Sequence, residues 1–188
     1  MINRLQATRH LVEHAPQALF VASCGNPKFD LAGAGDRESN FYMWNSMGLA
    51  SSIGLGLALA LPHRKVIILD GDGAILMNLG SLATAASKSP SNLVHIIWDN
   101  EQYQITGGQP SHTAGRADLA EIAAGAGTKK VMTVTSMEEF VAAAESFLNQ
   151  DGHWVIVAKT DDTGAPARPP KDPVLIKHRF MEAIRRSG

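Results

Sequence analysis

The chain has 188 residues, 45% of them hydrophobic, and a formal net charge of −1. These values fit a single globular domain over residues 1–188 that buries its own core, with a C-terminal tail and helix over residues 160–188. No basic stripe with interleaved aromatic residues is present, so nucleic acid is not an expected partner. The single cysteine excludes an internal disulfide framework and a cysteine-held iron–sulfur cluster within this chain.

No membrane association is expected. The N-terminal residues lack the apolar core of a secretory signal, and the apolar stretch 47–61 is too short and too rich in glycine to span a bilayer. The low cysteine content also fits a reducing compartment. We therefore expect a cytoplasmic protein.

Apolar strands and helices alternate along the chain, which predicts a three-layer α/β/α fold with a mostly parallel sheet. Strands are expected at 18–23, 41–44, 66–69, 93–98, 131–134 and 154–158, and helices at 3–14, 47–61, 79–87, 117–125, 137–149 and 174–186. We expect a turn at 24–27, a polar loop at 33–40 and a flexible loop at 107–115 that closes over substrate. Asn78 is expected to cap the following helix.

Polar residues follow two of the predicted strands directly. Strand 66–69 ends in Asp70-Gly71-Asp72-Gly73, and strand 93–98 ends in Asp99-Asn100. Parallel strands bring their carboxyl ends to one edge of the sheet, where open α/β sheets bind ligands. A carboxylate, an amide oxygen and backbone carbonyls are ligands that Mg²⁺ accepts, with substrate phosphates completing its shell. This pattern predicts a Mg²⁺-diphosphate site.

The same residues carry a resemblance to a known family. Gly71-Asp72-Gly73 followed by Asn100 resembles the thiamine-diphosphate (ThDP) motif. The stretch 46–59, SMGLASSIGLGLAL, precedes it, and Gly107-Gly108-Gln109-Pro110 follows it. From Ser23 to His112 the chain resembles the cofactor-binding (beta) subunit of sulfopyruvate decarboxylase and the matching C-terminal domain of phosphonopyruvate decarboxylase. The resemblance implies the diphosphate-binding (PP) domain of ThDP enzymes.

The resemblance also implies a set of site residues. Mg²⁺ would be held by Asp72, Asn100 and the backbone carbonyl of Gln102. Asn45 would offer its backbone carbonyl to the aminopyrimidine ring, and Met47 would support the cofactor in its bent conformation. The residues expected to contact the cofactor are Gly25, Asn26, Asn45, Ser46, Met47, Gly71, Asp72, Gly73, Ala74, Asn100, Gln102, Tyr103, Gln104 and Ile105.

Two of these positions depart from the family pattern, and others have a simpler interpretation. The family usually has Gly where this chain has Asn45, and many relatives carry Ser or Thr where it has Ala74. Cys24-Gly25-Asn26-Pro27 is also typical of an ordinary turn, and Met47 is also typical of core packing.

His112 is the predicted catalytic residue, as a proton donor or anion contact, although an exposed loop histidine is the alternative.

The implied activity is the non-oxidative decarboxylation of sulfopyruvate or phosphonopyruvate to an aldehyde. Such enzymes activate the aminopyrimidine with a glutamate from a second, pyrimidine-binding domain, and each candidate glutamate here is expected on the surface. We therefore predict that a separate alpha subunit supplies that glutamate in a hetero-oligomer. The acidic tail of the small 2-oxo acid substrate needs cationic donors. The candidates are Lys28, Arg37, His112 and Arg116.

Two other functions share parts of this pattern. One is the ThDP-binding beta subunit of a 2-oxo acid:ferredoxin oxidoreductase, although the single cysteine argues against a subunit that carries clusters. The other is a non-catalytic Mg²⁺-phosphate-binding module, in which the Gly-Asp-Gly turn serves another ligand.

Overall fold

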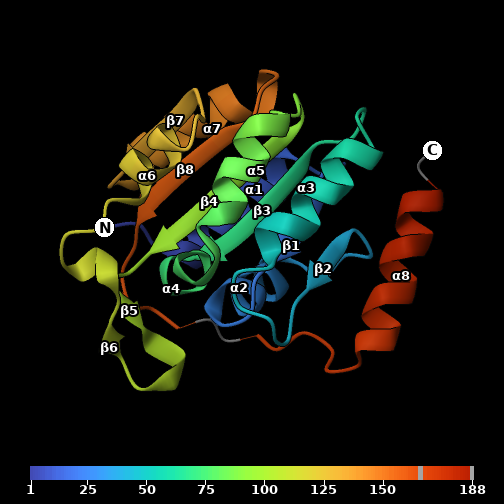
Figure 1. Ribbon diagram of the computed structural model, residues 1–188. Coiled ribbons are helices and arrows are strands. Elements are labelled where there is room, and N and C mark those ends of the chain that lie inside the picture. Colours follow the sequence, from blue (N-terminus) through green and yellow to red (C-terminus); the bar gives the residue numbers. More distant parts are fainter. Residues whose placement is uncertain (165–166, 187–188) are drawn as a thin grey trace.

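A computed structural model describes residues 1–164 and 167–186 and shows a six-stranded parallel sheet between two layers of helices (Figure 1). The strand order is β2-β1-β3-β4-β8-β7, and every neighbouring pair is parallel. The strands are β1 (Leu19–Ala22), β2 (Asn40–Tyr42), β3 (Val66–Gly71), β4 (Leu93–Asp99), β7 (Lys130–Val134) and β8 (Trp154–Lys159). The predicted α/β fold class is confirmed.

Three helices cover one face of the sheet: α1 (Arg4–His14), α2 (Asn26–Ala34) and α7 (Met137–Asn149). Their apolar side chains form one core cluster with the central strands. Phe140 and Phe147 of α7 are fully buried there, and the Phe140 ring centroid lies 5.6 Å from that of Trp98 on β4. Aromatic side chains of this size contribute much of the burial that stabilises this layer.

The opposite face carries α3 (Ala50–Ala60), α5 (Gly80–Lys88) and α6 (Leu119–Gly125), as seen in front of the sheet in Figure 1. Helix α3 approaches β3 closely at Gly54. A Cβ atom at that position would lie 2.3 Å from Ile68 Cγ1, so a larger residue would force the helix and the strand apart. Gly54 of stretch 46–59 thus permits close helix–sheet packing.

Helix α8 (Pro173–Arg185) lies at the β2 edge of the sheet. Ile176 and Phe180 are its buried residues, and the Phe180 ring centroid lies 5.4 Å from that of Phe41 on β2. Arg179 pairs with Asp36 in the segment before β2. The predicted C-terminal helix therefore packs against the sheet. Within the described part of the chain, no helix combines the length and hydrophobicity needed to cross a membrane.

Several local predictions were wrong. Residues 26–34 form α2, which overlaps the end of the expected turn at 24–27 and the start of the expected polar loop at 33–40, because Pro27 suits the first turn of a helix. Asn78 does not cap α5: it ends the short helix η1 (Leu76–Asn78), and its side chain donates to the Gly48 carbonyl at 2.9 Å. The loop 107–115 is more ordered than predicted. It contains β6 (Gln109–Pro110), which pairs with β5 (Gln102–Tyr103), and the turn η3 (His112–Ala114).

Candidate active site

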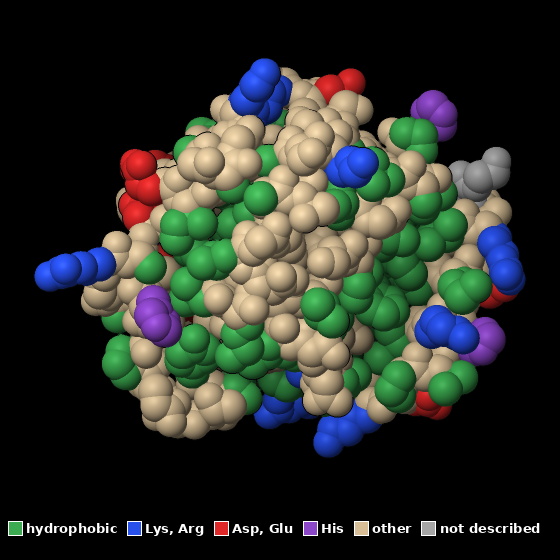
Figure 2. Space-filling model, viewed as in Figure 1, with side chains coloured by type: hydrophobic (Ala, Val, Ile, Leu, Met, Phe, Trp, Pro, Cys, Tyr) green, Lys and Arg blue, Asp and Glu red, His purple; other side chains and the backbone are tan. Residues whose placement is uncertain are grey.

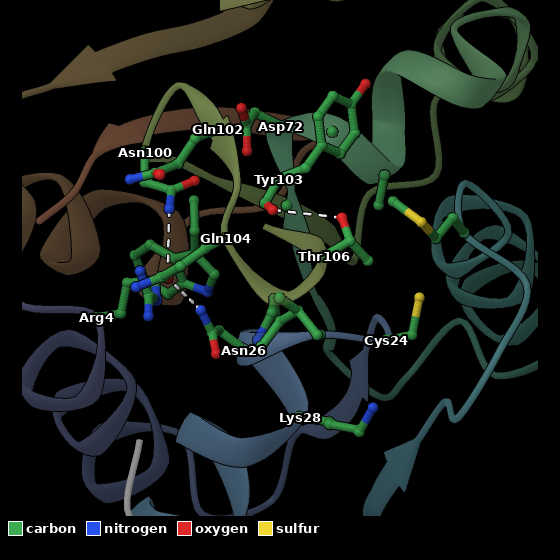
Figure 3. Close-up of a pocket in the computed structure, with 18 of the residues that line it drawn as sticks. Arg4, Cys24, Asn26, Lys28, Asp72, Asn100, Gln102, Tyr103, Gln104 and Thr106 are labelled. Atoms are coloured by element: carbon green, nitrogen blue, oxygen red, sulfur yellow. Dashed lines mark hydrogen bonds between the residues drawn. The ribbon is translucent and has the colours of Figure 1, made fainter. Parts of the chain in front are cut away.

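The strand order reverses between β1 and β3, because the chain proceeds from β1 to β2 on one side and then to β3 on the other. A crevice outside the carboxyl ends of the strands at such a point is the usual ligand site of an open α/β sheet. A cavity of about 320 Å³ lies at this place (Figure 3). It is lined by every residue predicted to contact the cofactor and also by Arg4, Cys24, Pro27, Lys28, Trp44, Trp98 and Thr106.

Three oxygen-bearing groups meet at one end of the cavity. The side-chain amide of Asn100 lies 3.3 Å from Asp72 Oδ1 and 3.0 Å from the backbone carbonyl oxygen of Gln102. With its NH₂ group turned inward, Asn100 donates to both oxygens; with its own oxygen turned inward, three oxygens face one point. Mg²⁺ prefers such ligands and needs only one or two protein carboxylates when phosphates complete its shell. The donor set therefore fits Mg²⁺ bound to a diphosphate.

Asp72 is held from its far side by two buried hydroxyls. Ser111 Oγ donates to Asp72 Oδ2 at 2.5 Å, and Thr113 Oγ1 lies 3.2 Å from the same oxygen and 2.7 Å from Asp99 Oδ1. The two hydroxyls are 2.8 Å apart. Since each has one proton, the shorter contacts assign Ser111 to Asp72 and Thr113 to Asp99. This leaves Oδ1 of Asp72 directed at Asn100.

The network continues to a lysine on the neighbouring strand. Lys159 Nζ donates to Asp99 Oδ2 at 2.7 Å and to Glu101 Oε1 at 2.9 Å, as the register of β4 and β8 pairs Asp99 with Lys159. Burial opposes the charged form of Lys159, but these carboxylates outweigh it and raise its pKa. Burial, reinforced by the nearby Asp99, raises the pKa of Asp72. A bound cation would favour the carboxylate form.

Sequence reasoning missed Ser111, Thr113 and Lys159 as parts of the site. Ser111 and Thr113 are only 5% and 7% exposed, although they lie in the segment predicted to be a flexible loop. Only Asp99, beside Asn100, gave a sequence signal for this network. The pairing of Asp99 with Lys159 follows from the strand register, which depends on residues far apart in the chain.

Glycines and short turns bring the backbone close to the cavity. Gly25 has φ +92°, in the region that favours glycine. A Cβ atom at Gly73 would lie 2.3 Å from Tyr103 Cε1, so the tyrosine ring occupies the space that a side chain would need. Here the short helix α4 (Asp72–Ile75) begins. The side chain of Asn26 donates to Gln104 Oε1, which joins the β1 and β5 sides of the cavity (Figure 3).

The structure separates some predicted alternatives. Met47 lines the cavity and is 37% exposed, so it is not a core residue in this chain. His112 is exposed and lies outside the cavity lining, so the geometry of this chain gives its catalytic role no support, and that role stays a prediction. Among the four predicted cations, Arg37 and Arg116 also lie outside the lining, whereas Lys28 is part of it.

None of the glutamates in the described residues lines the cavity. Glu101 points to Lys159, and each of the others is exposed. The described part of this chain therefore places no glutamate where it would reach a ligand in the cavity.

A doubly wound parallel sheet with oxygen ligands at its switch point defines a phosphate-cofactor-binding domain. Residues 32–158 match the sequence family described as thiamine pyrophosphate enzyme, C-terminal TPP binding domain, where thiamine pyrophosphate is another name for ThDP. The chain belongs to this family.

Relatives narrow the class to decarboxylases. The chain is 45% identical over 188 residues to the sulfopyruvate decarboxylase subunit beta of Methanocaldococcus jannaschii, covering 98% of both chains. It is 39% identical over 193 residues to the subunit of that name from Methanococcus maripaludis, covering 98% of this chain and 99% of the relative. The phosphonopyruvate decarboxylase of Streptomyces hygroscopicus is 39% identical over 176 residues, which cover 93% of this chain but 43% of that longer protein.

A solved structure shares the fold. The benzoylformate decarboxylase from Polynucleobacter necessarius superposes with a TM-score of 0.68 at 18% identity, covering 90% of this chain and 34% of that one. At this identity the likeness supports the architecture and carries no statement about substrate.

Proposed function

We propose that this chain is the ThDP- and Mg²⁺-binding subunit of a two-subunit 2-oxo acid decarboxylase that acts on sulfopyruvate or phosphonopyruvate. The observation that carries the proposal is the meeting of oxygens from Asp72, Asn100 and Gln102 at one end of a cavity at the switch point of the sheet. The names of the related subunits support the reaction and the substrate class.

The residues of the chain have distinct tasks in this proposal. Asp72, Asn100 and the Gln102 carbonyl would hold Mg²⁺, and Ser111 would keep Asp72 turned toward it. Met47, which also lines the cavity, would support the cofactor. When bound, ThDP would accept the electron pair that is left behind as CO₂ departs. The protein contributes binding, orientation and electrostatics.

A partner subunit would complete the site. The described part of the chain brings no glutamate to the cavity, and a glutamate is the group that activates the aminopyrimidine in the family it resembles. Ile105 lines the cavity and is 58% exposed, and Leu49 and Met77, which are close in sequence to the lining residues Met47 and Ala74, are 45% and 58% exposed. Figure 2 shows apolar side chains gathered in patches on the face of the molecule that carries α3 and α5. Such patches are typical of interaction surfaces.

The test is affinity capture of this chain from its native cells with ThDP and Mg²⁺ present. The captured material is identified by mass spectrometry and assayed for CO₂ release from sulfopyruvate, phosphonopyruvate and pyruvate. We expect a co-purifying pyrimidine-binding chain and activity only in the mixture. Robust decarboxylation by the purified chain alone would refute the need for a partner. In a thermal-shift panel, tighter binding of a nucleotide than of ThDP would favour a different ligand for the cavity.

Three further predictions stay open beside this proposal. They are the cytoplasmic location, the size of the hetero-oligomer and the extent of a single domain over residues 1–188.

A further inference from the structure

Lys28 is a buried cation at the cavity. Its side chain comes from the first turn of α2, is 4% exposed and forms part of the cavity lining. Figure 3 shows it beside Cys24, at the opposite end of the cavity from Asp72 and Asn100. A lysine is almost never buried to this degree unless it is paired, so its surroundings call for an explanation.

The described residues offer Lys28 no anionic partner. Within residues 1–164 and 167–186 no carboxylate lies within 4.0 Å of its Nζ atom, and its side chain makes no hydrogen bond. Its Nζ lies 4.3 Å from the ring centroid of Trp44 and 4.7 Å from that of Phe29. Aromatic faces attract a cation but leave its three N–H donors without oxygen acceptors. Burial accordingly lowers the pKa of Lys28.

Two further cations surround the same pair of rings. Arg168 Cζ lies 4.1 Å from the Phe29 centroid, and Lys171 Nζ lies 5.7 Å from the Trp44 centroid. Trp44 Nε1 donates to the Pro170 carbonyl at 2.8 Å and so fixes the C-terminal segment beside the cavity. Neither Arg168 nor Lys171 forms an ion pair in the described part of the chain.

The local charge at this end of the cavity is therefore positive and uncompensated. Mutual repulsion of Lys28 and Arg168 adds to the lowering of the Lys28 pKa. An anion that enters the cavity would relieve this repulsion and accept the free N–H donors of Lys28. Charge-assisted hydrogen bonds of this kind are roughly twice as strong as neutral ones.

We propose that Lys28 is a specificity-determining residue that binds the acidic tail of the substrate, a sulfonate or phosphonate oxyanion, at the end of the cavity away from the metal ligands. This inference rests on the proposed function, since it assigns the substrate's second anion to a particular side chain. The diphosphate belongs to the opposite end, with Asp72 and Asn100. In the bound state, the cofactor diphosphate and the acidic tail of the substrate would thus be held at separate ends of the cavity.

The experiment compares three variants of the chain, each assembled with its partner subunit, ThDP and Mg²⁺. Lys28→Met removes the charge but keeps an unbranched apolar side chain, and Lys28→Arg keeps the charge. Lys129→Gln is the matched control, because Lys129 is an exposed lysine outside the cavity lining. The kinetic readout is kcat/KM for sulfopyruvate, phosphonopyruvate and pyruvate. The binding readout is calorimetry with 3-sulfopropionate and with propionate, which are not decarboxylated.

For Lys28→Met we expect kcat/KM for the two acidic-tailed substrates to fall by about 10- to 100-fold, mainly through KM. Binding of 3-sulfopropionate should weaken by a similar factor. Values for pyruvate and propionate, which lack the second anion, should stay within about twofold. Lys28→Arg should recover part of the loss, and Lys129→Gln should behave as the parent chain.

Other results overturn the inference. An equal loss for all substrates with weaker ThDP binding would make Lys28 a cofactor ligand, and a fall in melting temperature with unchanged 3-sulfopropionate binding would make it structural. If the parent complex decarboxylates none of the three acids, the proposed function fails. The binding arm still decides the role of Lys28, because parent and Lys28→Met chains that bind 3-sulfopropionate equally would refute it.

Discussion

Removing the Ser111 hydroxyl should weaken Mg²⁺-dependent cofactor binding without unfolding the protein. Ser111 Oγ donates to Asp72 Oδ2 at 2.5 Å, and both side chains are buried. In Ser111→Ala the carboxylate loses its shortest hydrogen bond and gains freedom to turn Oδ1 away from Asn100. Outer-shell partners of this kind orient metal ligands.

The magnitude follows from the type of bond that is lost. A hydrogen bond to a charged group contributes about 1.5–3 kcal/mol, or about 10- to 150-fold in an equilibrium constant. Thr113 Oγ1, which lies 3.2 Å from the same oxygen, compensates in part. We therefore expect Ser111→Ala to raise the Mg²⁺ concentration needed for half-saturation by about 10- to 30-fold, within the range found for outer-shell changes.

Thr113→Val should have a smaller effect than Ser111→Ala, because the Thr113 hydroxyl donates to Asp99 at 2.7 Å and lies 3.2 Å from Asp72 Oδ2. The double variant should lose less than the sum of the single losses, since the two hydroxyls contact each other at 2.8 Å. Thr133→Val on the β7 edge is the matched control, because Thr133 is exposed.

The assay measures ThDP binding to the assembled chain and partner at increasing Mg²⁺ concentrations. Binding is detected by calorimetry and by near-ultraviolet circular dichroism. Melting temperatures without Mg²⁺ are measured beside it. Unchanged Mg²⁺ dependence in both Ser111→Ala and Thr113→Val would refute the argument that this network positions Asp72. A uniform loss of melting temperature would indicate a packing role instead.

Three other changes test the site and the fold. Asp72→Asn should abolish Mg²⁺-dependent ThDP binding in calorimetry, because it removes the one carboxylate of the oxygen set. Burial lowers the pKa of His153 from 6.5 to about 4, so the free energy of unfolding should fall by up to about 3 kcal/mol as pH drops from 6.5 to 4. Urea unfolding at pH 4.5 should show this loss in the parent chain and not in His153→Met. Gly54→Ala should destabilise by about 1–3 kcal/mol through its clash with Ile68, whereas Gly56→Ala in the same helix, which meets nothing within 4 Å, should not.

The regular elements were predictable where local pattern and tertiary packing agree. Helix 137–149 has the predicted bounds, since its apolar face recurs at helical spacing and Ser136 caps it by accepting from the Glu139 amide. Strand 93–98 was found because a continuous apolar run marks a strand that is buried on both faces. The helix at residues 26–34 was not predicted, because its local sequence pattern is weak and α2 depends on packing against α1.

The site was predictable to the extent that strand ends carry it. Asp72 and Asn100 each follow a parallel strand directly, so their proximity follows from the sheet. The roles of Ser111 and Thr113 depend on how a distant segment folds back onto Asp72, and no local pattern encodes that contact. The burial of Lys28 on α2 likewise depends on Trp44, which comes from the segment that follows β2.

The charges of the cavity support a division of work between two chains. One end presents oxygens to a cation, through Asp72 and Asn100, and the other presents the Lys28 cation to an anion. A molecule bound between them is held at both ends, yet the described residues place no glutamate beside it to move a proton. Binding by one chain and proton transfer by another would make catalysis depend on assembly. Under this arrangement the chain should bind ThDP and Mg²⁺ more tightly after assembly, because the partner closes the open side of the cavity and excludes water from its charged groups.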